Sequence, residues 1–505
     1  MNRRKFIKNI GIGAGAMMAA NMLQGSLVQL NALSTDIPGY ESIFGITSKE
    51  MNKILSIALE KGGDFSELFF EYTISNSMMM QDDILKSSSE SIIKGVGIRV
   101  LKGEQTGYGY ANELTFDKLR ETALAAASIA DGGSRIKIAD FNVRKPKHNY
   151  YDLNTIIAES ELEQKIKLVS SAYQSALNYD GKIAKVTSSL GDSIQFVTIA
   201  NSEGELISDL RPQARLVVRA TAEDNGKRGT GSYNQGGRVG FDFFNHDVTP
   251  EEIGKNASRE AIILLDAENA PAGEMPVVLS KDQSGVMIHE AVGHPLEADG
   301  NWKGQSLMAD KMGQMVANPL VTIYDDATIP NYRGSLNIDD EGTETENVML
   351  IEKGRLVGFM HDKLSAKMMN TKSNGHGRRE SYVNPPIPRM NNTVLEKGDS
   401  IPEDIIKSVK KGFYAVSYQG GQVQNTGKFT FSVNLGYLIE DGKLTKALRN
   451  ATLIGNSIEI MKDVDMIGND TGFFLGNCGK DGQTVPVTCG TPTLRIKKMT
   501  VGGQL

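Results

Sequence analysis

The stretch Met275–Pro295, MPVVLSKDQSGVMIHEAVGHP, joins a short apolar strand to a helix that carries two histidines. Met275–Leu279 has the apolar character of a buried strand. Ser280–Gln283 (SKDQ) has capping-box spacing, so we expect a helix that runs through Gly285 to His289 and beyond. The sequence therefore predicts that the two histidines directly follow a buried strand.

The two histidines are five positions apart, at His289 and His294 in HEAVGH. At 3.6 residues per turn this spacing separates them by about 140° round an α-helix, so a regular helix cannot aim both rings at one ion. Either the helix widens into a π-type turn, or it ends at Gly293. Gly293 permits such a change, and Pro295 disfavours a helical conformation at His294. The alternative is a pair of unrelated histidines at the end of a helix.

A catalytic zinc site takes three protein ligands, and the chain offers few candidates for the third. It has 6 histidines and 2 cysteines, and the other four histidines have polar neighbours typical of hydrogen-bonded or solvated side chains: His148, His246, His361 and His376. Cys478 has small neighbours, in GNCGK, that leave its thiol accessible, whereas the alternating pattern around Cys489 is typical of a small core residue. A thiolate beside two imidazoles suits zinc. The chemistry favours Cys478 without excluding Cys489.

Helical and strand-like segments of the chain are mixed but do not strictly alternate, a pattern that favours an α+β fold over a doubly wound sheet. We expect a mixed-sheet and helix region at 40–245, followed by a β-rich C-terminal domain at 246–505. Gly226–Gly240 is interpreted as a flexible loop or linker. The expected helices are 47–62, 115–130, 160–178 and 249–267, and the expected strands lie at 67–73, 91–101, 106–110 and 183–222.

The composition excludes several classes of protein. Two cysteines in 505 residues exclude a disulfide scaffold, a four-cysteine zinc ribbon and a cysteine-ligated iron–sulfur cluster. A net charge of −6 argues against a sequence-independent nucleic-acid binder, and we expect no nucleic-acid partner.

The first residues look like a targeting signal. Arg3–Lys8 reads RRKFIK and resembles a twin-arginine motif, and the apolar residues 10–23 lead to a small-residue region at 31–34. We expect residues 1–34 to be a signal peptide that directs export to the periplasm; the alternative is an uncleaved amphipathic N-terminus. No later stretch approaches 18 consecutive apolar residues, so no stable membrane anchor is expected.

Several long motifs, in order, resemble the TldD/PmbA metallopeptidase family on its TldD-like side. The resemblance covers residues 63–503. Its motifs are HEAVGH at 289–294, DDEGT at 339–343, GRRESY at 377–382, PIPRMNNT at 386–393, GGQV at 420–423, ATLIGN at 451–456 and CGKDGQTVPV at 478–487.

The resemblance implies a zinc-dependent metalloprotease that hydrolyses peptide bonds in peptides or unfolded segments. The family's zinc ligands fall on His289, His294 and Cys478, with one Zn²⁺ per chain, and its catalytic glutamate falls on Glu290. Glu290 would accept a proton from a water that the metal activates.

Charged residues within the family motifs have two interpretations each. Arg378, Arg379 and Arg389 could bind a peptide carboxylate or carbonyl, and the alternative is internal salt bridges with nearby acidic residues. Asp339–Glu341 could hold a metal, but a solvated turn is favoured.

The family is also understood to be dimeric. We expect a homodimer, or a heterodimer with a PmbA/TldE-like subunit. The main alternative function is a non-catalytic PmbA/TldE-like partner subunit of a protease complex, which the intact His289, Glu290, His294 and Cys478 disfavour. A third hypothesis is the family's older label of gyrase modulator, and an exported acidic protein is poorly placed for that role.

Overall fold

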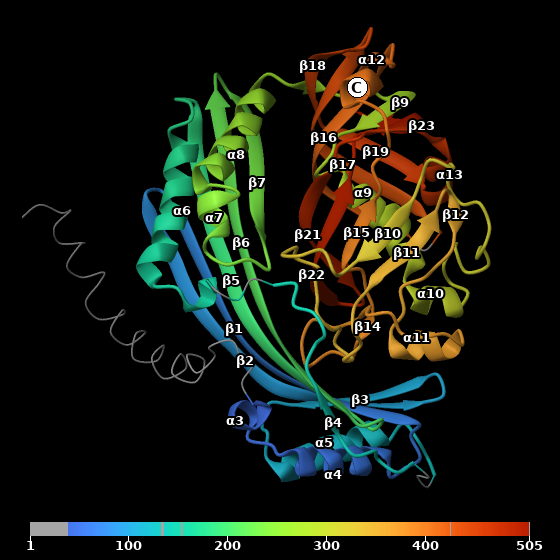
Figure 1. Ribbon diagram of the computed structural model, residues 1–505. Coiled ribbons are helices and arrows are strands. Elements are labelled where there is room, and N and C mark those ends of the chain that lie inside the picture. Colours follow the sequence, from blue (N-terminus) through green and yellow to red (C-terminus); the bar gives the residue numbers. More distant parts are fainter. Residues whose placement is uncertain (1–38, 133–135, 152, 154, 425, 504–505) are drawn as a thin grey trace, which may run out of the picture.

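A computed structural model of the chain describes residues 39–132, 136–151, 153, 155–424 and 426–503. The expected signal peptide at 1–34 lies outside these residues. A long curved N-terminal sheet stands beside a β-rich C-terminal half, and the fold is α+β as the sequence predicts (Figure 1). Within the described residues, no helix combines the length and the apolar character needed to cross a membrane.

The N-terminal sheet has seven strands in the order β3-β2-β1-β5-β6-β4, with β7 also paired to β6. Neighbours are antiparallel except β4, which runs parallel to β6. The strands are β1 (Phe65–Gln81), β2 (Ile84–Lys102), β3 (Gln105–Ala111), β4 (Asn142–Arg144), β5 (Ile183–Asn201), β6 (Glu205–Asp224) and β7 (Lys227–Gly237).

Helices cover the N-terminal sheet at two places (Figure 1). One group packs at the end near β3 and the other over β5, β6 and β7. The predicted helix starts at Thr47 and Thr249 are confirmed, because each threonine forms a capping box with the glutamate three residues later. The helices are α3 (Tyr40–Phe44), α4 (Ser48–Leu59), α5 (Phe116–Ala127), α6 (Leu162–Leu177), α7 (Phe243–His246) and α8 (Pro250–Leu265), with the short turn η1 (Ile157–Glu159).

The prediction of a loop or linker at Gly226–Gly240 is wrong, because most of it forms strand β7. A Cβ on Gly229 would lie 2.2 Å from the carbonyl oxygen of Ala261, and one on Gly231 would lie 2.2 Å from that of Ala257. The glycines therefore allow helix α8 to lie directly on the strand. Because α8 packs in this way, it belongs to a core of the N-terminal half. The division into 40–245 and 246–505 stays a prediction.

The C-terminal half is built on an eight-stranded sheet that closes into a barrel. Its order is β16-β9-β23-β19-β17-β18-β8, with β20 on β23, and an additional β16–β17 pairing joins five strands in a ring. The strands are β8 (Glu268–Asn269), β9 (Gly273–Leu279), β16 (Lys411–Val423), β17 (Lys428–Glu440), β18 (Lys443–Arg449), β19 (Ala451–Asn456), β20 (Val464–Ile467) and β23 (Leu494–Gly502).

A six-stranded sheet in the order β12-β11-β10-β15-β22-β21 packs with this barrel around one large apolar core, and β21 is its edge strand. Its strands are β10 (Ile323–Asp326), β11 (Asn347–Glu352), β12 (Arg355–Leu356), β15 (Asn392–Leu395), β21 (Gly472–Lys480) and β22 (Gln483–Thr491). A small pair, β13 (Gly377–Arg378) and β14 (Ile387–Pro388), and the helices α10 (Ala298–Trp302), α11 (Lys363–Met368), α12 (Pro402–Lys407) and α13 (Ser457–Asp463) complete this half.

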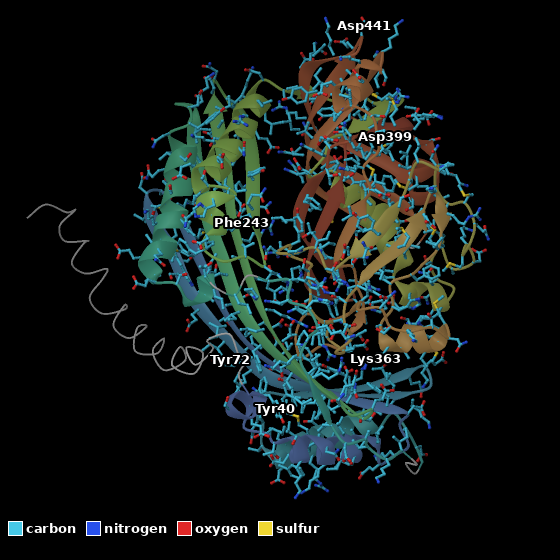
Figure 2. The ribbon with its side chains drawn as sticks, viewed as in Figure 1. Tyr40, Tyr72, Phe243, Lys363, Asp399 and Asp441 are labelled. Carbon is cyan, nitrogen blue, oxygen red and sulfur yellow. The ribbon has the colours of Figure 1, made fainter. Side chains whose placement is uncertain are left out.

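Buried ion pairs join the two halves. Arg99 on β2 contacts Glu341 of the C-terminal half, and Arg379 of the C-terminal half reaches Glu67 on β1 at 2.5 Å. None of these four side chains is more than 1% exposed in its ion pair. Lys363, labelled in Figure 2, lies at the same junction. It donates to Glu205 at 2.9 Å.

Candidate metal centre

The chain segment that carries both histidines is a π-helical turn. Helix α9 (Gly285–Ile288) continues into the π turn η2 (His289–Gly293) and then the 3₁₀ turn η3 (His294–Leu296). The backbone N–H of His294 donates to the carbonyl of His289, the i to i+5 bond that defines a π turn. As a result the two imidazole rings meet, with their centroids 5.0 Å apart. Of the two paths left open by the sequence, the chain takes the π turn.

The helix before this turn is shorter than the sequence predicts. It begins at Gly285, with Ser284 rather than Ser280 before its first residue, and the Ser280 hydroxyl donates to the carbonyl of Val416 on β16. Asp282 takes a positive φ of 72°, so the backbone changes conformation between strand β9 and helix α9. The capping-box prediction at Ser280–Gln283 is therefore wrong.

Two residues make the end of the π turn fit its surroundings. A Cβ on Gly293 would lie 1.9 Å from the Sδ of Met390, so only glycine allows Met390 to pack against the turn. Pro295 stands in the first turn of η3, where its missing N–H needs no partner.

Edge strand β21 brings Cys478 to the two histidines. The thiol Sγ lies 3.4 Å from His294 Nε2, and one ligand atom from each of His289, His294 and Cys478 lies within 4.8 Å of the others. In the described part of the chain this is the one group of three or more His, Cys, Asp or Glu side chains close enough to hold a metal. Cys489, on the neighbouring strand β22, is buried and lies outside the group.

The donor set fits a zinc ion. Two imidazoles and a thiol, mostly buried, are ligands that zinc prefers. His289 is 4% exposed, and its Nδ1 is buried with no hydrogen-bond partner. Burying a ring nitrogen without a hydrogen-bond partner costs free energy of folding. Such a cost is expected where the ring serves to bind a metal.

The charges in the group favour a thiolate. Burial alone would raise the pKa of Cys478, but the imidazoles of His289 and His294 lower it to about 4. Burial would lower the pKa of His294, but Glu297 and Cys478 raise it to about 9. A thiol that deprotonates easily is ready to bind a metal cation.

Glu297 holds the far side of the His294 ring and was not predicted from the sequence. Its Oε2 lies 2.9 Å from His294 Nδ1 and 3.2 Å from Lys480 Nζ, and its Oε1 lies 3.7 Å from Arg389 Nε. Burial would raise the pKa of Glu297, but Lys480 and His294 lower it to about 2. The signal was present, because a ligating histidine usually donates its other ring N–H to a carboxylate and Glu297 is three residues away.

Glu290 lines a cavity of about 720 Å³ together with the ligand candidate His294. Its Oε2 is 3.8 Å from His294 Nε2. Burial raises the pKa of this carboxyl, against the opposing effect of His289. The cavity is also lined by residues of η3, α10 and the ends of β16 and β21, including Gly421, Asn477 and Gly479.

The three arginines proposed for substrate are all buried and bind protein groups. Arg389 donates to the carbonyl of Cys478 at 2.6 Å, and Arg379 pairs with Glu67. Arg378 donates to the carbonyls of Met390 and Pro486. Arg378 and Arg379 border a second cavity, whose lining does not include Glu290. Their role in substrate binding stays a prediction.

The expectation of a solvated turn at Asp339–Glu341 is wrong. All three side chains are buried, and Asp340 pairs with Arg211 at 2.5 Å while Glu341 pairs with Arg99. Asp339 accepts backbone N–H groups of Glu341, Thr343 and Gly377. Asp340 and Glu341 join the two halves, Asp339 holds its own turn, and none of the three belongs to the candidate metal group.

Comparison with known proteins agrees with these observations. Models of the PmbA/TldA metallopeptidase match domain 1 at residues 66–130, the central domain at 156–265 and the C-terminal domain at 272–503. The chain is 42% identical to the metalloprotease TldD homolog of Haemophilus influenzae over 91% of this chain and 97% of that protein. It is 28% identical to the zinc metalloprotease TldD homolog of Saccharolobus solfataricus over 90% of this chain and 100% of that protein.

Solved structures share the fold at low sequence identity. A putative modulator of DNA gyrase from Thermotoga maritima superposes with a TM-score of 0.74 at 23% identity, over 90% of this chain and 100% of that chain. TldE from Thermococcus kodakarensis superposes with a TM-score of 0.71 at 20% identity, over the same shares of the two chains.

Proposed function

Because the chain belongs to the PmbA/TldA metallopeptidase family, also called TldD/PmbA, we propose that it is a zinc-dependent peptidase that cleaves peptides or unfolded segments. One observation carries this proposal: His289, His294 and Cys478 converge beside Glu290, and Glu290 faces a cavity. The cavity, at about 720 Å³, is within the range of ligand-binding sites and would accept a short stretch of peptide.

His289, His294 and Cys478 would hold one Zn²⁺. When bound, zinc supplies a Lewis acid that polarises a carbonyl and makes a water easier to deprotonate. Glu297 fixes the orientation of the His294 ring through Nδ1, which leaves Nε2 on the side of Cys478.

Glu290 is the proposed general base. A carboxylate oxygen of Glu290 would accept the proton of the attacking water and then deliver it to the leaving amine nitrogen. Its burial raises its pKa, and a raised pKa makes the carboxylate a better proton acceptor near neutral pH.

The alternative is a non-catalytic PmbA/TldE-like partner subunit. The likeness to TldE concerns the fold alone, and this chain carries the ligand set and Glu290. We further propose that the protein works as a homodimer or with a PmbA/TldE-like subunit. Residues 1–34 are proposed to export it by the twin-arginine route, and cell fractionation tests that location.

The decisive experiment is cleavage of a peptide library by the zinc-loaded chain, with Glu290→Ala as the matched variant. We expect Glu290→Ala to lose about 10²–10⁴-fold in kcat while zinc content by metal analysis stays at one per chain. Full activity in that variant would contradict the role of Glu290. Cleavage that appears only after a partner subunit is added would favour the heteromer.

A further inference from the structure

Four arginines near the junction of the two halves have no carboxylate partner within the described residues. Three of them are buried and the fourth is half-buried: Arg238, Arg333, Arg378 and Arg215. Their recorded hydrogen-bond partners are backbone carbonyls and side-chain amides. By contrast, the nearby Arg211 and Arg379 pair with aspartate and glutamate.

This concentration of positive charge is costly. Burial, with a smaller contribution from neighbouring guanidiniums such as Arg238, lowers the pKa of Arg333 and of Arg378 to about 9, and at Arg378 the carboxylate of Asp340 opposes this shift. Arg238 is 3% exposed, its Nη1 reaches only the carbonyl of Pro212 at 3.4 Å, and its Nε is buried with no partner. Buried charges are normally paired, so guanidiniums that form no ion pair are suited to bind an added anion.

A cavity of about 310 Å³ lies beside this cluster, between the N-terminal sheet and strand β22. Arg238 and Arg378 line it, and so does Gln213, which accepts a hydrogen bond from Arg333. On the opposite side Thr484 and Pro486 of β22 complete the wall.

The part of the sheet face that forms the cavity wall carries polar side chains, whereas another part of the same face carries apolar ones. Two adjacent rows cross β1, β5 and β6 in register and line the cavity: Thr73, Gln195 and Arg211, then Ser75, Ser193 and Gln213. Farther along the same face, the row Phe69, Ile199 and Ile207 packs against Ile338 in an apolar cluster. The change in character marks a place built for a polar ligand.

We propose that this cavity binds a carboxylate, namely the C-terminal carboxylate of a peptide substrate or product. Guanidinium forks match the planar carboxylate. A singly charged group suits the cavity better than a phosphate, because Glu71, Asp340 and Glu380 also line it.

The position of the cavity connects it with the metal centre. Thr484 and Pro486 pair in register with Gly479 and Asn477 on β21, and these two residues line the cavity of Glu290. The strand pair that carries Cys478 is thus shared by both cavities. The choice of a peptide as the source of the carboxylate rests on the proposed peptidase function, whereas the need for an anion rests on the arginines.

Binding to the zinc-loaded full chain, with Glu290→Ala present to prevent turnover, tests the proposal. The probes are N-acetyl-Ala-Ala-Ala with a free carboxylate, its C-terminal amide, and N-acetyl-Ala-Glu-Ala-amide, titrated by calorimetry. We expect the free acid to bind about tenfold more tightly than the amide. Arg238→Gln should abolish that preference, and Arg120→Gln, an exposed arginine on α5, should retain it.

Ser193→Phe provides a second variant, because it fills the cavity while every arginine remains. It too should abolish the preference. Equal binding of acid and amide, or a preference that survives in both Arg238→Gln and Ser193→Phe, would overturn the proposal. Preference for the internal glutamate peptide would support a carboxylate site and overturn the C-terminal source.

Metal removal separates this proposal from the proposed function. The preference should persist after zinc is removed with a chelator, even if the chain proves to have no peptidase activity. A preference that disappears with zinc but survives in Arg238→Gln would place the carboxylate on the metal and refute the arginine site.

Discussion

Replacing Glu297 with glutamine should weaken zinc binding without removing a proposed ligand. The substitution keeps the size of the side chain but removes the charge that faces His294 Nδ1 at 2.9 Å, Lys480 Nζ at 3.2 Å and Arg389 Nε at 3.7 Å. Loss of a carboxylate behind a ligating histidine typically costs 10- to 100-fold in metal affinity, or about 1.4–2.8 kcal/mol.

The same substitution should destabilise the fold by about 1–3 kcal/mol, because buried cations lose a charged partner. This loss of unfolding free energy is at the low end of the range for a broken buried ion pair, because Lys480 still pairs with Asp299 at 2.7 Å. Competition with a chromophoric chelator measures zinc affinity, and urea unfolding of the metal-free chain measures stability.

Asp299→Asn is the matched control. It removes the other carboxylate of Lys480 but leaves the contact between Glu297 and His294 in place. Zinc affinity should therefore stay within about twofold of the parent chain. The reasoning fails if Glu297→Gln binds zinc as tightly as the parent, or if Asp299→Asn loses as much affinity.

Three further substitutions probe the π turn, the thiol and a buried carboxyl. Gly293→Ala places a Cβ 1.9 Å from the Sδ of Met390, so urea unfolding should show a loss of about 1–3 kcal/mol; an unchanged midpoint would contradict this packing. Cys478→Ser should lose stoichiometric zinc by metal analysis, whereas Cys489→Ser should keep it, and the reverse result would exchange their roles. Burial raises the pKa of Asp362 to about 7, above the unfolded value near 4, so its stabilisation is complete below about pH 4 and is lost as pH rises through about 7. Asp362→Asn should therefore flatten the fall in the unfolding midpoint between about pH 4 and about pH 7, and an identical pH profile would refute the assignment.

Local patterns predicted the parts of the fold that depend on neighbours in sequence. The helix starts at Thr47 and Thr249 were predictable because a capping box involves only four consecutive residues. Ser280 has the same spacing, but Asp282 takes a positive φ of 72° and the helix begins later, while the Ser280 hydroxyl contacts a carbonyl 136 residues away. Spacing alone does not report the backbone path between the residues.

Long-range packing explains the other errors. Glycines at 229 and 231 indicate a loop by composition, yet they serve the close approach of α8 to β7. Asp340 and Glu341 indicate a solvated turn, yet their arginine partners lie 129 and 242 residues away. The candidate metal site was easier to predict, because a chain with 2 Cys and 6 His offers few possible ligand sets. In addition, the five-residue spacing of His289 and His294 requires an irregular helix if both bind one ion.

The ion pairs at the junction of the halves have a consequence for recombination between relatives. Arg99 of the N-terminal half forms an ion pair with Glu341 of the C-terminal half. Glu67 of the N-terminal half forms an ion pair with Arg379 of the C-terminal half. Each half therefore completes the charge balance of the other. A chimera that joins the N-terminal half of one relative to the C-terminal half of another would bury an unmatched charge unless the first parent carries Glu67 and Arg99 and the second carries Glu341 and Arg379. Exchange of one half alone is therefore constrained by the junction, although the largest apolar cores lie within the separate halves.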